Sequence, residues 1–184
     1  MRVENKVIAQ ADEIKNSPKR ELQAKPLLSL LLFSISPILF LFDMIDIYMA
    51  VFIVFISTLS YIDMLRNWVP DILIHIVSWY GLICVMLGFS GNGIIEQSLS
   101  AILYVTPFVI INLLSFLRYK GFVFASGDLY IALSIGLWSN VFLSISSSSI
   151  AILLAFTFVK IKKINELAFI PFMLIPLILI RVIY

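Results

Sequence analysis

Long apolar runs separated by short polar breaks dominate the pattern of this chain. A run of about 20 apolar residues can span the hydrocarbon core of a bilayer as an α-helix. The pattern predicts runs of this kind at residues 27–42, 45–62, 72–89, 94–117, 129–145, 146–159 and 167–184. We therefore expect an all-α fold, a polytopic membrane helix bundle. The expected number of transmembrane helices is about seven, within a range of about six to eight.

The first two runs are separated by only a few residues around Asp43 and Asp46, so two arrangements compete. The runs form either a tight helical hairpin or one long helix kinked at Pro37. We favour the hairpin because the joined runs exceed the length of a single span. The run 146–159 is short and begins with four serines, which makes its assignment as a span the weakest.

Residues 1–25 form a polar leader with few large apolar side chains. Such a composition is typical of a solvated helix or a loose tail. The chain is therefore predicted to have two parts, a cytoplasmic leader over 1–25 and a membrane-embedded domain over 26–184.

The composition also indicates an integral membrane protein, with 61% hydrophobic residues, 13% charged residues and a mean hydropathy of +1.07. So few charges cannot cover the surface of a soluble globule. The single cysteine, Cys84, lies in an apolar run, which excludes a disulfide framework and a zinc site built from cysteine pairs. The net charge of +2 is small and scattered, so no nucleic-acid partner is expected. We expect neither a metal nor a cofactor.

The positions of lysine and arginine predict the orientation in the membrane. If residues 1–25 are cytoplasmic and all seven runs cross, only Arg181 of the 13 basic residues faces outward. The acidic residues Asp43, Asp46 and Glu96 then occupy the outer turns. The positive-inside rule therefore favours a cytoplasmic N-terminus.

Two aspartates, Asp63 and Asp128, lie at the boundaries of apolar runs, where a carboxylate is costly to keep and indicates a function. With the predicted topology, both arrive at the cytoplasmic face. Two carboxylates held close together share a proton, so that one can activate water while the other protonates a scissile carbonyl. This pattern favours aspartyl protease chemistry. Taken singly, either aspartate is equally well explained as a helix cap or an interfacial loop residue.

The residues around both aspartates carry a family resemblance. Asp63 is followed seven residues later by Pro70 and then Asp71, and Gly127-Asp128 opens a later helix. Further matching positions are Pro26, Leu27, Leu28, Ala132, Gly136, Trp138, Ile170, Pro171, Phe172 and Pro176. Over residues 26–176 the chain resembles the type IV prepilin peptidase family of GxGD membrane aspartyl proteases.

The resemblance implies an aspartic-type endopeptidase of the bacterial inner membrane. It implies that the substrates are type IV pilin or pseudopilin precursors, whose short basic leader is removed on the cytoplasmic side. It also implies partners among pilus or secretion assembly components, and it places the two catalytic aspartates on Asp63 and Asp128. The larger members carry a cytoplasmic domain with paired Cys-x-x-Cys motifs, which this sequence does not contain, so methyltransferase activity is not inferred.

Two positions depart from the family pattern. The first glycine of Gly-x-Gly-Asp is Ala125, and the lysine usual two residues after the aspartate is Tyr130. An alanine would be strained if the turn needs a positive φ, but tolerated if the turn is only closely packed. Tyr130 replaces a cation with a neutral phenol, which removes one nearby charge from the carboxylates.

Other residues have supporting roles in this hypothesis. Gly127 allows close backbone approach, and the first amides of its helix could support an oxyanion. Asp71 is predicted to cap the third helix, with a catalytic role as the alternative. His75, one turn later, is predicted to hydrogen-bond with Asp71, with tuning or shuttling of protons as the alternative. Arg66 is interpreted mainly as a topology charge, with substrate steering as a second role.

Other functions are also compatible with the chain. Its buried polar residues could build a small ion- or proton-coupled transporter subunit, and these residues are Glu96, Thr106, Asn112 and Ser134. The chain could also be an inactive peptidase relative that acts in assembly. Coupling sites usually lie at mid-bilayer, whereas both aspartates lie near the boundary, and no repeat relates the two halves. We therefore favour the peptidase.

Overall fold

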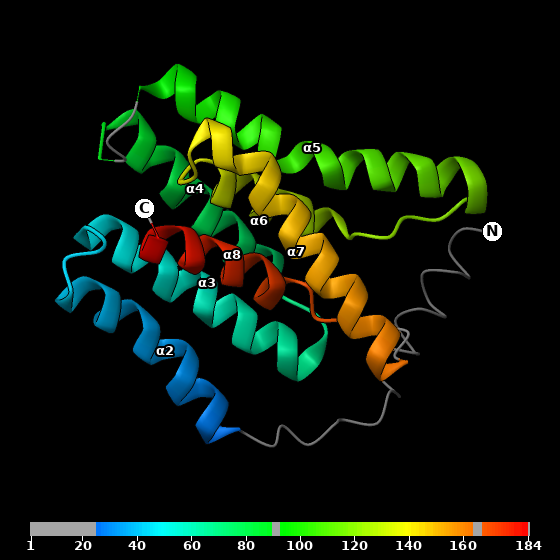
Figure 1. Ribbon diagram of the computed structural model, residues 1–184, viewed down its shortest axis with the longest axis horizontal. Coiled ribbons are helices and arrows are strands. Elements are labelled where there is room, and N and C mark those ends of the chain that lie inside the picture. The colour runs from blue at the N-terminus through cyan, green and yellow to red at the C-terminus, as the bar shows by residue number, and fades with distance from the viewer. Residues whose placement is uncertain (1–24, 90–92, 164–166, 184) are drawn as a thin grey trace, which may run out of the picture.

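The computed structural model describes residues 25–89, 93–163 and 167–183 (Figure 1). All regular structure in these ranges is α-helical. The helices are α2 (Pro26–Leu41), α3 (Ile47–Arg66), α4 (Asp71–Met86), α5 (Ile94–Tyr119), α6 (Ser126–Gly136), α7 (Val141–Lys162) and α8 (Ile170–Ile183). The predicted all-α fold is confirmed. The polar leader, apart from Lys25, lies outside the described residues.

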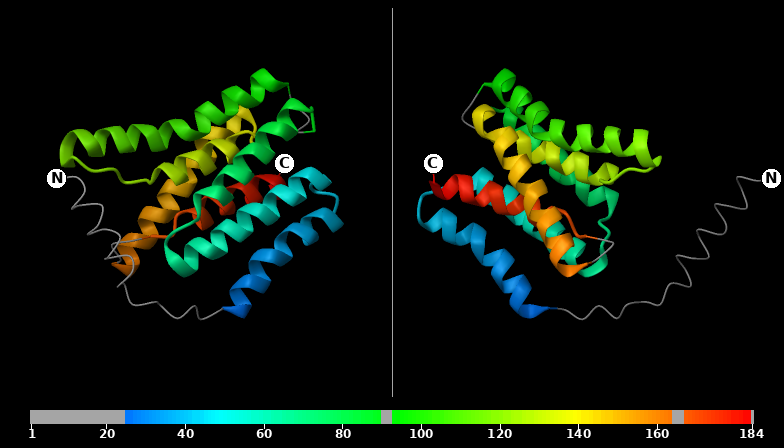
Figure 2. Two further views of the ribbon diagram at one scale, coloured as in Figure 1. Left: turned by 180° about the vertical axis from the view of Figure 1, so that it is seen from behind. Right: turned by 45° about the vertical axis from the view of Figure 1, so that its right-hand side comes forward.

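The hairpin predicted from the first two runs is present. α2 ends at Leu41 and α3 begins at Ile47, and the two helices pack side by side along one edge of the bundle (Figures 1 and 2). Asp46 caps α3 by accepting the Met49 N–H at 2.7 Å, and Ser36 Oγ donates to the Ala50 carbonyl at 2.7 Å across the pair. Pro37 lies inside α2 without ending it.

The predicted boundary between the fifth and sixth runs is wrong. α6 stops at Gly136, and α7 already begins at Val141, so neither 129–145 nor 146–159 forms a helix of its own. Asn140 caps α7 by accepting the Phe142 N–H at 3.0 Å. The serines continue the helix because their hydroxyls bond to the preceding turn, as in the 3.0 Å bond from Ser148 Oγ to the Ile145 carbonyl.

Three of the described helices, α3, α5 and α7, are long and apolar enough to cross a membrane. α2, α4 and the Ile170–Leu179 part of α8 are apolar but shorter. α6 has 11 residues, which corresponds to about 16 Å of helix and about half of a hydrocarbon core. Helix length therefore supports a membrane protein but does not establish about seven crossings.

α6 lies in the interior of the bundle, where α5, α4 and α8 contact it, while α8 packs between α3 and α7 (Figure 2). A Cβ added at Gly136 would lie 2.5 Å from Ala101 Cα and 2.8 Å from Tyr104 Cβ. Glycine thus allows the α6 and α5 backbones to meet, as small residues do between membrane helices. This contact fixes the short helix that carries Asp128.

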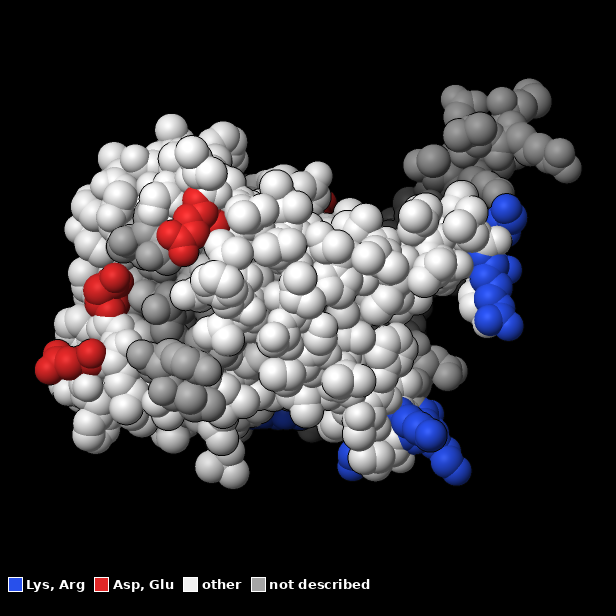
Figure 3. Space-filling view, turned by 45° about the horizontal axis from the view of Figure 1, so that its top comes forward, with Lys and Arg blue, Asp and Glu red and all other residues white. Residues whose placement is uncertain are grey.

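Charged side chains separate toward the two ends of the described part of the bundle (Figure 3). Successive helices alternate in direction, so the polar ends of the helices form two groups. One end carries the basic residues Lys25, Arg66, Arg118, Lys120, Lys160, Lys162 and Lys163. The opposite end carries Asp43, Asp46 and Glu96. This separation agrees with the charge asymmetry expected from the sequence.

Candidate active site

A cavity of about 630 Å³ opens at the basic end of the bundle, where α3 and α7 end and α4, α6 and α8 begin. Three carboxylates, those of Asp63, Asp71 and Asp128, belong to its wall. The rest of the wall is largely apolar and includes Ile74, Phe124, Ile131, Ile152, Ala155, Phe156, Val159, Leu167 and Phe169. The cavity therefore combines acid groups with a surface suited to an apolar chain.

Asp63 lies one turn before the end of α3 and is 7% exposed. Its Oδ2 accepts the N–H of Ile170, the first residue of α8, at 3.1 Å. The first amides of a helix have no partner within the helix, so a carboxylate is a suitable acceptor for them. Four residues after Asp63, Asn67 turns the chain with a φ of 50° and donates its N–H to the Asp63 carbonyl at 2.7 Å. α3 therefore ends beside the start of α8.

Asp128 lies in the first turn of α6. Its Oδ2 accepts the N–H of Ala125, the N-cap residue, at 3.2 Å. This bond is half of a capping box, because alanine has no side-chain acceptor to complete the other half. Ala125 has a φ of −67° and a ψ of 158°, which any residue adopts. The turn does not require glycine at this position, so the departure at Ala125 introduces no backbone strain.

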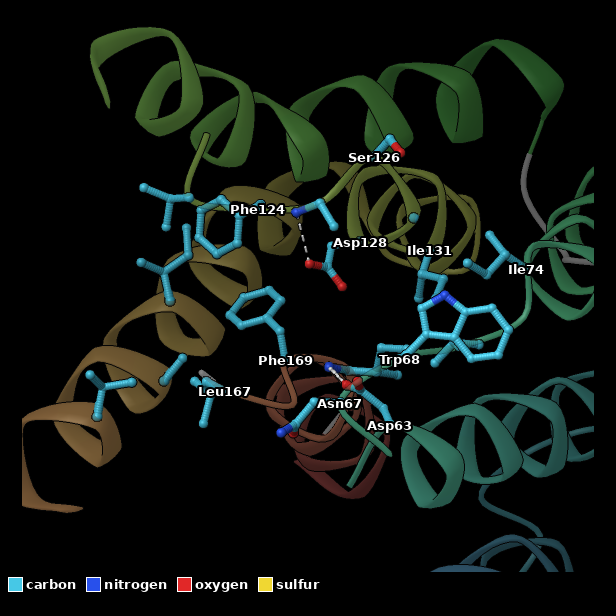
Figure 4. A pocket seen from close by; sticks show the side chains of 18 of the residues that line it. Asp63, Asn67, Trp68, Ile74, Phe124, Ser126, Asp128, Ile131, Leu167 and Phe169 are labelled. Atoms are coloured by element: carbon cyan, nitrogen blue, oxygen red, sulfur yellow. Dashed lines mark hydrogen bonds between the residues drawn. The ribbon is translucent and has the colours of Figure 1, made fainter. Parts of the chain in front are cut away.

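Figure 4 shows the carboxylates of Asp63 and Asp128 pointing into the same cavity from opposite walls, α3 and α6. Asp128 belongs to α6, which is not one of the three described helices that are long enough to cross a membrane. Burial, and then the charge of Asp63, raise the pKa of Asp128 to about 6, against a smaller opposing effect of the Ala125 N–H. A pair arranged in this way can hold one proton at a pH at which ordinary carboxyls are ionised.

Gly127 also lines the cavity, in close contact with α4. A Cβ added there would lie 2.8 Å from Ile74 Cδ1. The φ of Gly127 is not positive, so the backbone conformation does not require glycine, and the atom that a Cβ would displace is the terminal methyl of the Ile74 side chain.

Asp71 lines the cavity, but the predicted cap is wrong. Pro70 occupies the N-cap position of α4, no side chain caps this helix, and Asp71 is its first residue. The expected bond to His75 is also absent among the hydrogen bonds of the described residues. Because Pro70 is the N-cap, the Asp71 carboxylate lies in the first turn of α4. The helix dipole favours a negative charge there even without a capping hydrogen bond.

The other residues predicted to support the site lie outside the cavity wall. Arg66 is exposed in the last turn of α3. The ring centroids of His75 and Tyr130 are 5.9 Å apart with their planes tilted by 56°, and Tyr130 is 53% exposed. The structure thus brings together Asp63, Asp71, Gly127 and Asp128, and it places Arg66, His75 and Tyr130 around them.

Sequence reasoning missed two groups at this site. The amide of Ile170 binds Asp63, although 107 residues separate them, and a backbone N–H leaves no signal in a sequence. Asn112 holds the loop before Asp128 through three hydrogen bonds. Its polarity within an apolar run is a usable signal, although from the sequence alone it also supports a transporter.

Comparison with known protein families gives a match to the type IV leader peptidase family over residues 50–160. The matched region is more than half of the chain and contains both Asp63 and Asp128. The chain belongs to the type IV leader peptidase family. This confirms the resemblance inferred from the sequence and, with the three long apolar helices, indicates a membrane protein of a peptidase family. No curated protein and no solved structure matches the chain.

Proposed function

We propose that this protein is a prepilin leader peptidase, a membrane aspartyl endopeptidase that cuts the basic leader from type IV pilin or pseudopilin precursors. The observation that carries the proposal is the convergence of Asp63 and Asp128 on one cavity, in a chain of the type IV leader peptidase family. The raised pKa of Asp128 supports it, because the reaction needs one protonated and one ionised carboxyl.

In the proposed reaction, the ionised carboxylate accepts a proton from water while the water oxygen bonds to the scissile carbonyl carbon. The protonated carboxyl donates to the carbonyl oxygen, which gives a neutral gem-diol. The carbon–nitrogen bond then breaks, and the amine nitrogen receives the proton that came from water. A gem-diol hydroxyl returns its proton to the second carboxyl, which restores the pair.

The position of the cavity suggests how a precursor binds. Basic residues lie at its end of the bundle, so we assign this end to the cytoplasm. The family resemblance implies that the bilayer is the bacterial inner membrane. The apolar stretch of the substrate would contact the wall formed by Ile152, Ala155 and Phe156 of α7. The basic leader of the substrate would remain in the cytoplasm, and pilus or secretion assembly components would receive the product.

The test is processing of a candidate prepilin by Asp63→Asn, Asp128→Asn and the double variant. We expect each to lower kcat by at least about 10³-fold, with no further loss in the double variant, because the pair acts as a unit. Asp46→Asn is the matched control, since Asp46 caps α3 at the opposite end and asparagine caps a helix equally well. The shortened pilin product is detected by mass spectrometry, and the amount of each peptidase variant in the membrane is measured by immunoblotting.

Retained cleavage in either single variant would exclude the two-aspartate mechanism. A wild-type protein that cuts no prepilin at all would favour the inactive relative acting in assembly.

A further inference from the structure

Asn112 of α5 holds the loop that leads to Asp128. Its side chain is 7% exposed, and both ends of the carboxamide are used. Oδ1 accepts the N–H groups of Val123 and Phe124 at 3.0 and 2.8 Å, and Nδ2 donates to the Phe124 carbonyl at 3.0 Å. One side chain thus replaces the backbone partners that this irregular segment lacks.

A cluster of three phenylalanines joins this loop to the start of α8. Phe108 of α5 is fully buried and lies one turn before Asn112 on the same helix face. Its ring centroid is 5.2 Å from that of Phe124 and 5.5 Å from that of Phe169, with near-perpendicular planes. Phe124 and Phe169 are 4.8 Å apart. These are favourable aromatic geometries, so the two loops are packed as one unit.

Each loop provides the amide that binds one carboxylate. Phe124 directly precedes Ala125, whose N–H binds Asp128, and Phe169 directly precedes Ile170, whose N–H binds Asp63. In Figure 4 the rings of Phe124 and Phe169 lie beside the two aspartates. A shift of either ring would therefore move an amide and the carboxylate that it orients.

We propose that Asn112 is a positioning residue, which sets the separation of the two carboxylates by fixing the Asp128 loop against the Phe108–Phe124–Phe169 cluster. The catalytic consequence rests on the proposed peptidase function. Asn112 itself touches neither carboxylate in the described hydrogen bonds, and it acts through the backbone at residues 123–124.

The three hydrogen bonds of Asn112 to Val123 and Phe124 form the Asn112 clamp. Two variants test whether this clamp, or only the volume of the Asn112 side chain, positions the loop. Asn112→Leu removes all three hydrogen bonds, and we expect kcat about 100-fold lower with KM changed less than about threefold, because a small misplacement of reacting groups is costly. Asn112→Asp keeps the acceptor for the two N–H groups but, when ionised, sets a negative oxygen against the Phe124 carbonyl. When protonated, the same carboxyl donates there and restores the clamp.

The Asn112→Asp variant should therefore be rescued by acid. Relative to wild type at the same pH, we expect kcat about 30-fold lower at about pH 8 and within about threefold at about pH 5. Other charged groups lie nearby: Asp63, Asp71 and Asp128 around the cavity, and Arg118 and Lys120 at the end of α5. They are common to both proteins, so the ratio at each pH reports what the new carboxyl changes, which includes the effect of its charge on Asp128.

The matched control is Asn140→Asp, the same substitution at the cap of α7 at the opposite end of the bundle. Because aspartate also accepts the Phe142 N–H, we expect its ratio to wild type to stay near one at both pH values.

A second measurement does not need activity. Spin labels at Gly121→Cys and Ile161→Cys, in a Cys84→Ala background, report the distance between the Asp128 loop and α7. A Cβ added at Gly121 meets no atom within 4 Å, and Ile161 is 71% exposed, so both positions are open sites for attaching a label. We expect a narrow distance distribution that broadens in Asn112→Leu and, at about pH 8, in Asn112→Asp.

An unchanged distribution in Asn112→Leu would overturn the clamp. A broadened distribution with an unchanged kcat would overturn its role in positioning the carboxylates. If the wild-type protein cuts no prepilin while the distribution still broadens, the proposed function fails and the clamp stands.

Discussion

Asp63 and Asp128 are both held by amides at the start of a helix, of α8 and α6 respectively. Such amides lack partners within their own helix, so they orient a carboxylate without a cation. This arrangement bears on Tyr130, which stands where the family usually has a lysine. The backbone already supplies donors to the pair, and Tyr130 points its ring toward His75 outside the cavity wall.

The raised pKa of Asp128 predicts the pH profile of cleavage. A raised carboxyl pKa means that the folded protein retains the proton above the ordinary value and loses it as pH rises through about 6. Since the proposed reaction needs one protonated carboxyl, we expect kcat/KM to fall about tenfold per pH unit on the alkaline side. Initial rates of prepilin cleavage in detergent across a pH series measure this limb. A rate that is constant from about pH 5 to about pH 8 would contradict a shared proton.

At the scale of elements, the short α6 places Asp128 inside the bundle. Residues of α6 such as Ile131, Ala132 and Ile135 are fully buried, and Gly136 brings the helix against α5. Because α6 is surrounded by α4, α5 and α8, the position of its first turn depends on tight packing at its last turn.

This packing predicts the effect of a single methyl group. Gly136→Ala would set a Cβ 2.5 Å from Ala101 Cα, so α5 and α6 must separate. We expect a loss of about 1–3 kcal/mol in the free energy of unfolding, measured by denaturation in detergent. Gly121→Ala is the control, since a Cβ there meets nothing within 4 Å. Equal stability of the two variants would show that the contact at Gly136 is not tight.

At the scale of the whole molecule, charge and chain direction act together. The helices alternate in direction, which gathers the basic residues and the cavity at one end. The positive-inside rule then predicts which end faces the cytoplasm.

Reporter fusions test this orientation. Fusions after Lys25, Lys120 and Lys163 should report the cytoplasm, and a fusion after Tyr184 should report the outside. A cytoplasmic signal from the last fusion alone would mean that α8, which follows Lys163, does not cross. The short α6 would be implicated if the fusion after Lys163 reported the outside as well.

The position of the cavity also predicts where a substrate can be cut. The scissile bond should lie just before the membrane segment of the precursor, because the carboxylates lie at the basic end of the bundle. Moving the cut point by about one helical turn, about 5 Å, into the apolar stretch should stop processing. Lengthening the leader at its free end should leave the rate unchanged. Equal processing of shifted and native cut points, followed by mass spectrometry, would contradict a boundary site.

The sequence by itself determined the all-α fold, the α2–α3 hairpin and the placement of both aspartates at one end. Hydropathy predicts helices because burial in lipid requires every backbone group to be bonded within the helix. Two helices, α4 and α5, separate α3 from α6, so alternation alone returns the chain to the same end. The motifs around Asp63 and Asp128 were sufficient to indicate the family.

Only the tertiary structure decided how the site is held. From 129 to 159 the longest polar stretch is residues 146–149, but it lies inside α7. The end of α6 and the start of α7 therefore depended on the Asn140 cap and the contact at Gly136. The bond from Ile170 to Asp63 and the clamp at Asn112 involve backbone groups, which every residue possesses. Their partners are chosen by packing between distant segments, and such a choice leaves no local pattern in the sequence.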